Sequence, residues 1–204
     1  NSTRGIYQTS GQLTVVNCLI SYNVYATGDY TPPGAGVRIS GGAINLVNTV
    51  IAHNRGGDRG AGICQTSVGI GSTLMATNCV ITKNASTWAA AIYMDGGTSS
   101  YKNCIVWDNT CLEDWEQAMP PYPQMSYGYG VNATYSCFQT GGSPIPGGGN
   151  ISQDPMLLDS PDTLGTLSPV SPCIDAGTAV GAPATDILGV ARPQGGRVDM
   201  GAYE

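Results

Sequence analysis

Short apolar stretches recur along this chain at nearly constant spacing, and each is framed by asparagines. The repeated phrase is Asn, then Cys or Thr, two branched aliphatic residues, two variable residues and a second Asn; it begins at Asn17, Asn48, Asn78 and Asn103. The apolar runs are short, rich in β-branched residues and separated by glycines, which predicts strands and not helices. A phrase that returns every 25 to 31 residues indicates one structural unit stacked on copies of itself.

A second phrase precedes the first and begins at Gly5, Gly36, Gly62 and Ala91. The interval to the first Asn of the next phrase is 12 residues in three units and 16 in the unit that starts at Gly62. Each unit therefore holds two short strands at a fixed separation and one loop of variable length. We predict an all-β, right-handed parallel β-helix of about five coils over residues 1–140, with a long loop inserted near residues 110–130.

Equivalent residues of such a solenoid form columns, because successive coils lie about 4.8 Å apart. Two inward apolar columns are expected, namely Ile6, Val37, Ile63 and Ile92, and Ile20, Ile51, Ile81 and Val106. A structural ladder is expected from Asn17, Asn48, Asn78 and Asn103. Asn tolerates a left-handed backbone at a turn, and its amide can bond up and down the stack.

Composition narrows the possible partners. The net charge is −6 and the sequence pI is near 4.5, which argues against nucleic acid, whose phosphates require a basic surface. No apolar run reaches the roughly 18 residues that span a bilayer, so no membrane span is predicted. The first strand starts soon after Asn1, and no signal peptide precedes it, so we expect a fragment or a processed mature form.

The seven cysteines have two interpretations. Cys18, Cys79 and Cys104 share a repeat position that Thr49 also occupies, which favours a small buried side chain. Cys111 lies in a loop and is the best disulfide candidate, with either Cys137 or Cys173 as its partner. No Cys or His spacing typical of a metal site occurs, so no metal or other cofactor is predicted.

One polar column contains several kinds of titratable side chain. Its members, at the position before the second Asn, are Tyr22, His53, Lys83 and Asp108. His53, Lys83 and Asp108 are weak catalytic candidates for a polysaccharide lyase or hydrolase, chemistry that uses clustered acids and bases. The alternative is a solvated face with a weak Lys83–Asp108 pair. No stacked carboxylates support the enzyme, so a protein without catalysis is favoured.

Aromatic residues suggest contact with a polysaccharide. An outward column holds Tyr7, Arg38, Cys64 and Tyr93, and loops add Trp115 and Tyr122; aromatic rings of this kind present apolar faces to sugars. Packing of loops against the coils explains the same residues without a ligand. Calcium binding by Asp154, Asp159 and Asp162 is a further alternative, although turn capping accounts for these side chains equally well.

From about Gly141 the repeat stops, and residues 141–204 form a Pro/Gly-rich segment with spaced motifs. They read Ser171-Pro172-Cys173-Ile174-Asp175-Ala176-Gly177, Asp186-x-x-Gly189-x-x-Arg192 and Val198-Asp199-Met200-Gly201-Ala202-Tyr203-Glu204. This segment closely resembles the C-terminal region of bacterial choice-of-anchor Q proteins, in which it follows a parallel β-helix. The resemblance implies a bacterial protein that is secreted or anchored at the cell surface. We expect the tail to cap the coils, closed by turns and ion pairs of Asp175, Asp186, Arg192 and Asp199.

These observations favour an extracellular structural or adhesive module. Strand edges at the end of a β-helix invite pairing with another chain, so head-to-tail assembly into a fibre is predicted. The alternatives are a polysaccharide lyase or hydrolase and a carbohydrate-binding module.

Overall fold

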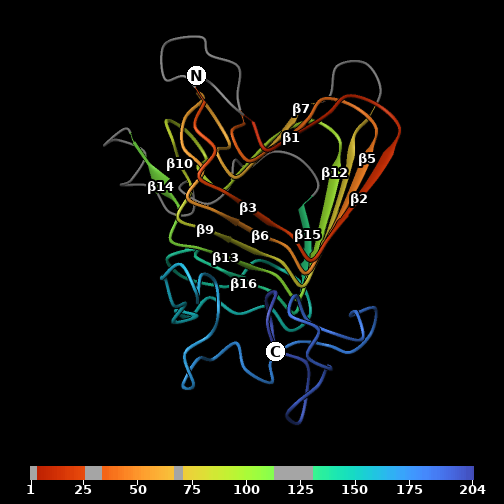
Figure 1. Cartoon of the computed structure of the whole chain (residues 1–204), viewed down its shortest axis with the longest axis vertical. Helices are drawn as coiled ribbons and strands as arrows, with labels where there is room; N and C mark the ends of the chain where they lie inside the picture. The colour runs from red at the N-terminus through yellow and green to blue at the C-terminus, as the bar shows by residue number, and fades with distance from the viewer. Residues whose placement is uncertain (1–3, 26–33, 67–70, 113–130) are drawn as a thin grey trace.

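The computed structural model describes residues 4–25, 34–66, 71–112 and 131–204. These residues contain parallel strands stacked in three large sheets and one two-stranded sheet, and no helix occurs among them (Figure 1). The all-β parallel solenoid predicted from the repeats is thereby confirmed. Within the described part of the chain there is no helix long and apolar enough to cross a membrane.

The chain passes through the three sheets in turn. Sheet A consists of β1 (Ile6–Gln8), β4 (Val37–Ile39), β7 (Ile63–Thr66) and β11 (Ile92–Asp95). Sheet B consists of β2 (Gln12–Val16), β5 (Ala43–Val47), β8 (Thr73–Thr77), β12 (Thr98–Lys102) and β15 (Val131–Thr134). Sheet C consists of β3 (Leu19–Ser21), β6 (Val50–Ala52), β9 (Val80–Thr82), β13 (Ile105–Trp107) and β16 (Cys137–Phe138). A short pair, β10 (Ala85–Ser86) and β14 (Thr110–Cys111), lies beside them.

The core contains the two predicted aliphatic columns together with inward residues of sheet B such as Ile44, Leu46 and Leu74. Ile6, Val37, Ile63 and Ile92 are register partners in sheet A, and Ile20, Ile51, Ile81 and Val106 are register partners in sheet C. Apart from Ile6 and Ile20 at the first rung, these side chains are fully buried. Because side chains alternate across a strand, every second residue of the repeat faces this interior.

The tail covers the outer face of sheet C. Val50, Val80 and Ile105 point away from the interior, yet they are fully buried because Leu164, Met200 and other tail residues pack on them. In the units that contain Val50, Val80 and Ile105, two adjacent aliphatic residues are therefore both buried, one inside the solenoid and one beneath the tail. In Figure 1 the tail lies below the last rungs, at the end opposite the first strands. β16 ends at Phe138, and the segment that follows contains only isolated bridges such as Leu157–Leu167.

Candidate functional site

Guanidinium groups and aromatic rings gather on the outward side of sheet A. We call this surface the arginine–aromatic face; its members are Arg4, Tyr7, Tyr25, Arg38, Arg59, Trp88 and Tyr93. Tyr7 and Trp88 are the most accessible rings, with 52% and 37% of their surface exposed. A chain with a net charge of −6 thus places three of its eight basic residues on one surface.

The register of sheet A brings these side chains together. Tyr7, Arg38, Cys64 and Tyr93 occupy one outward column on β1, β4, β7 and β11. Arg59 and Trp88 lie beside it, joined by a parallel bridge that places the indole one rung from the guanidinium. Arg4 precedes β1 and donates from Nε to the carbonyl of Gly34 at 3.1 Å.

Each guanidinium lies over at least one ring. The Arg4 Cζ is 3.9 Å from the ring centroid of Tyr25 and 5.4 Å from that of Tyr7, and the Arg38 Cζ is also 5.4 Å from Tyr7. The Arg59 Cζ is 5.0 Å from the Tyr93 centroid and 5.4 Å from Trp88, and its Nη1 donates to the Tyr93 hydroxyl at 2.6 Å. Such contacts attract a guanidinium to the face of a ring and hold it in place.

Glycines let the connecting chain lie flat against this face. Gly34 has a φ of +85°, and a Cβ there would lie 2.9 Å from the Cβ of Cys64. Gly60 has a φ of +60°, and a Cβ there would lie 2.9 Å from the Cβ of Tyr93. Only glycine combines this backbone conformation with so close an approach.

The electrostatics of the face follow from its three cations. Burial raises the pKa of the Cys64 thiol to about 12, and the charges of Arg38, Arg4 and Arg59 act in the opposite direction. The charges of all three guanidiniums therefore reach the thiol of Cys64, which lies in the middle of the outward column. Asp58 forms an ion pair with Arg59 at 3.1 Å, which leaves the balance of the surface positive.

The second predicted column is also brought together, with an addition from the tail. His53 Nε2 lies 2.8 Å from Asp159 Oδ1, and its ring stacks on Tyr22 with centroids 4.8 Å apart. Lys83 forms a close ion pair with Asp108 and a longer one, 3.9 Å, with Asp159. The hydrogen bond to Asp108 raises the pKa of Lys83, so the amine is protonated at neutral pH and is not available as a general base.

Both asparagine columns are structural. Asn17, Asn48, Asn78 and Asn103 all have φ near +50°, and their amides bond in pairs, Asn48 to Asn17 at 3.0 Å and Asn103 to Asn78 at 3.1 Å. The second Asn of each phrase forms a continuous ladder, buried except at Asn23, that was not predicted from the sequence; its members are Asn23, Asn54, Asn84 and Asn109.

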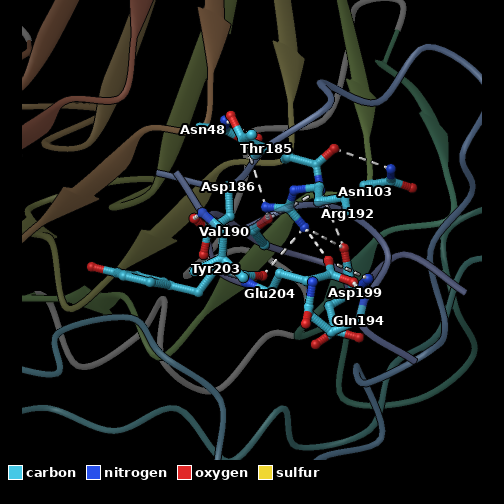
Figure 2. A network of polar contacts seen from close by, with 12 residues as sticks. Asn48, Asn103, Thr185, Asp186, Val190, Arg192, Gln194, Asp199, Tyr203 and Glu204 are labelled. Atoms are coloured by element: carbon cyan, nitrogen blue, oxygen red, sulfur yellow. Dashed lines mark hydrogen bonds and ion pairs between the residues drawn. The ribbon is translucent and has the colours of Figure 1, made fainter. Parts of the chain in front are cut away.

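The tail closes around Arg192, as Figure 2 shows. Arg192 Nη1 pairs with Glu204 Oε2 at 2.8 Å, and both side chains are only 1% exposed. Arg192 Nη2 donates to the carbonyl of Gly201 at 3.0 Å and reaches Oδ1 of Asn48 at 3.5 Å, so the network joins the tail to the solenoid. Asp186 accepts from three backbone amides, those of Leu188, Val190 and Glu204.

Asp175 and Asp199 bind backbone amides in the same part of the tail. Asp199 Oδ1 accepts from the amide of Asp175, and Asp175 Oδ1 accepts from that of Arg197, both at 2.7 Å. Asp154, a residue considered for calcium, caps the amide of Met156 at 2.8 Å. Across the described ranges no group of three metal-ligating side chains is found.

The remaining predicted site residues fall in two groups. Trp115 and Tyr122 lie outside the described residues. Of the disulfide candidates, Cys137 and Cys173 share one buried cluster, whereas Cys111 belongs to β14. Arg4, Arg59 and Trp88 were not predicted as site residues, because they lie outside the repeated strands. The bridge between Arg59 and Trp88, which shows that they are neighbours on adjacent rungs, could not be inferred from the repeat spacing.

Comparison of the chain with family models, with curated proteins and with solved structures finds no match. The class of protein is therefore defined by the structure, as a parallel β-solenoid with a tail docked on sheet C.

Proposed function

We propose that this chain is an extracellular adhesive module of a bacterial surface protein and that its arginine–aromatic face binds an acidic polysaccharide. The observation behind this proposal is the set of three guanidiniums held over aromatic rings on sheet A. Rings such as Tyr7 and Trp88 offer flat apolar surfaces to sugar rings. Guanidiniums bind carboxylate or sulfate groups with two parallel hydrogen bonds. The location outside the cell is supported by the resemblance of the C-terminal motifs.

Binding is favoured over catalysis by the state of the titratable column that contains His53, Lys83 and Asp108. Lys83 is held protonated by Asp108, and His53 is engaged by Asp159. A lyase needs a base that can remove a proton from the sugar, and a hydrolase needs a free acid and a second carboxylate. The paired side chains instead join the tail to sheet C, because Asp159 comes from the tail.

Affinity electrophoresis tests the proposal. Gels that contain polygalacturonate or a sulfated glycan are expected to retard the protein, whereas neutral dextran gels are not. Added salt should weaken the retardation, because exposed charges are screened within about 10 Å at 0.1 M. Equal migration in acidic and neutral gels would contradict the proposal.

Two matched pairs of variants locate the site. Tyr7→Ala is expected to reduce retardation at least several-fold, whereas Tyr22→Ala removes an even more exposed tyrosine, at 65%, from a different column and should have no effect. Arg59→Gln is expected to weaken binding, whereas Arg197→Gln removes a tail arginine that also lies over a tyrosine ring, at 5.6 Å. A reduction by the control variants as large as that by Tyr7→Ala or Arg59→Gln would exclude this face.

Self-association is a second proposal, because three strand edges lie together at one end. β1, β2 and β3 are the outer strands of their sheets, and Val16 and Leu19 are about half exposed there. Strand edges with exposed apolar residues pair readily with strands of a second copy. A head-to-tail fibre also needs an open strand edge at the other end of the solenoid. At that end Ile151 bridges to Cys137 and occupies the edge of β16, so this edge is not open.

Sedimentation over a range of concentrations, together with electron microscopy, distinguishes fibres from dimers and monomers. Leu19→Lys is expected to abolish association, because it places a charge beside the β3 edge. Leu188→Lys, at a tail residue that is 75% exposed, serves as the control. A protein that stays monomeric at high concentration would refute self-association and leave polysaccharide binding untouched.

A further inference from the structure

Two buried cysteines from distant parts of the chain meet where the tail docks. Cys137 belongs to β16, the last strand of sheet C, and Cys173 belongs to the tail, 36 residues later. Both are fully buried in the cluster that also contains Val80, Ile105 and Met200. The two thiols lie close enough to perturb each other, and Cys137 Sγ donates to the carbonyl of Gln153 at 3.2 Å. No other pair of thiols in the described residues links the solenoid to the tail in this way.

We propose that Cys137 and Cys173 form a disulfide bond that ties the tail to the last strand of the solenoid. The two side chains are buried in one cluster and perturb each other, and a disulfide between them requires their sulfurs to lie about 2.05 Å apart. The loop that this bond closes contains much of the tail, so it restricts a long segment of the unfolded chain. Such a bond suits an oxidising compartment and forms there whether or not the chain binds a polysaccharide.

A second pair of thiols shows what the geometry excludes. Cys79 and Cys104 also perturb each other, but they occupy equivalent positions on adjacent rungs. Each thiol donates to the carbonyl two residues before it, at 3.4 Å from Cys79 and 3.3 Å from Cys104, so the two side chains run side by side. In-register pairing of adjacent rungs places the two Cβ atoms about 4.8 Å apart. This exceeds the Cβ separation of about 3.8 Å that is usual in a disulfide. We therefore expect this pair to stay reduced.

The bond forms by thiol–disulfide exchange with a small disulfide such as oxidised glutathione. One cysteine thiolate attacks a glutathione sulfur and releases one glutathione thiolate, which leaves a mixed disulfide on the protein. The thiolate of the second cysteine then attacks the protein sulfur of that mixed disulfide and releases the second glutathione. In total the protein loses two protons and two electrons, and oxidised glutathione becomes two molecules of reduced glutathione.

The structure also indicates when the exchange takes place. The neighbouring Cys173 thiol and burial raise the pKa of Cys137 far above its ordinary value, so almost no thiolate exists in the folded state. Neither thiol is accessible to an oxidant once the tail is docked. We expect the bond to form during folding, before the tail closes, and only slowly in the reduced folded protein.

Refolding in a glutathione redox buffer tests this proposal. The refolded protein should show five thiols in denaturant instead of seven and a mass lower by about 2 Da. A chymotryptic map should contain one cross-linked pair that joins Cys137 to Cys173. Seven free thiols, or a cross-link that involves Cys111 or joins Cys79 to Cys104, would overturn the assignment.

Stability and variants give two further readouts. The oxidised protein should melt roughly 5 to 15 °C above the reduced protein, a comparison that needs no substitution. Cys137→Ser and Cys173→Ser should each show six thiols after oxidative refolding, whereas Cys64→Ser should show four. If Cys137→Ser still loses two thiols on oxidation, or if oxidation leaves the melting temperature of the wild type unchanged, the proposal fails.

Discussion

At the scale of single residues, Arg192 and Glu204 form a buried ion pair within the tail. Its side chains are almost completely buried, and each charge depends on the other for compensation. Arg192→Met is expected to lower the free energy of unfolding by about 3–5 kcal/mol, because it leaves Glu204 buried and unpaired. Urea denaturation measures the loss. Arg197→Met, at a more exposed arginine of the same segment, is the control, and an equal loss in both variants would contradict the assignment.

Asp199 gives a prediction that depends on pH. Burial is the main cause that raises its pKa above the ordinary 3.8, and the charge of Glu204 adds to it. Because the folded state holds this proton more tightly than the unfolded state, the ionised carboxylate destabilises the fold once the pH exceeds the folded pKa. Asp199→Asn keeps an oxygen for the amide of Asp175 and removes the charge.

Thermal melts should therefore show Asp199→Asn to be more stable than the wild type at pH 7, with the difference disappearing near pH 3, where the carboxyl is protonated. Asp162→Asn changes an exposed carboxylate of the tail and should give no gain at pH 7. A loss of stability in Asp199→Asn at neutral pH would show that the carboxylate is needed as an anion.

At the scale of the repeat, the buried asparagine ladder connects the rungs. Asn84 donates to Asn109 and to the carbonyl of Ile51, and its oxygen accepts from the side chain and the amide of Asn54. Asn84→Ala leaves several buried groups without partners and is expected to cost about 2–4 kcal/mol. Asn23→Ala, at the partly buried end of the ladder, should cost less than half as much in the same denaturation assay.

The two asparagine columns show what a sequence pattern can and cannot predict. Spacing and the left-handed preference of Asn are local properties, so the turn position of Asn17 and its equivalents follows from the sequence. The ladder of Asn84 depends on a side chain turned into the interior, a choice that the repeat does not display. The polar column of His53 was recognised, but its partner Asp159 comes from 106 residues away and required the tail to be placed.

At the scale of the molecule, the repeats predict the solenoid and its inward columns, because rung spacing follows from strand pairing. They do not predict the surface on which the tail lies. Val50 and Val80 look like ordinary core residues in the sequence, and only the structure shows that they bury against Met200 and not inside the coil. The arginine–aromatic face combines strand and loop residues, so only part of it, including Tyr7 and Arg38, was visible in the spacing.

Docking of the tail makes stability uneven along the solenoid. A stack of repeats is held by its nearest-neighbour interfaces, so an end rung frays unless another segment covers it. The first rung has a neighbour on one side among the described residues, and Leu19 is 55% exposed because the tail does not reach it. The last rungs, by contrast, lie under the tail through Met200 and Cys173.

Hydrogen exchange followed by mass spectrometry is therefore expected to show least protection in β1–β3 and most in β9 and β13. Tail amides should exchange as slowly as these strands, because the amide of Gly201 donates to the carbonyl of Asn103 at 2.7 Å and that of Met200 to the carbonyl of Cys173 at 3.0 Å. Arg192→Met should speed exchange in the tail and at β13 more than in β1–β3. If the tail exchanged quickly in the wild type while β9 stayed protected, it would be a separate, weakly attached unit, and the solenoid would be stable without its cover.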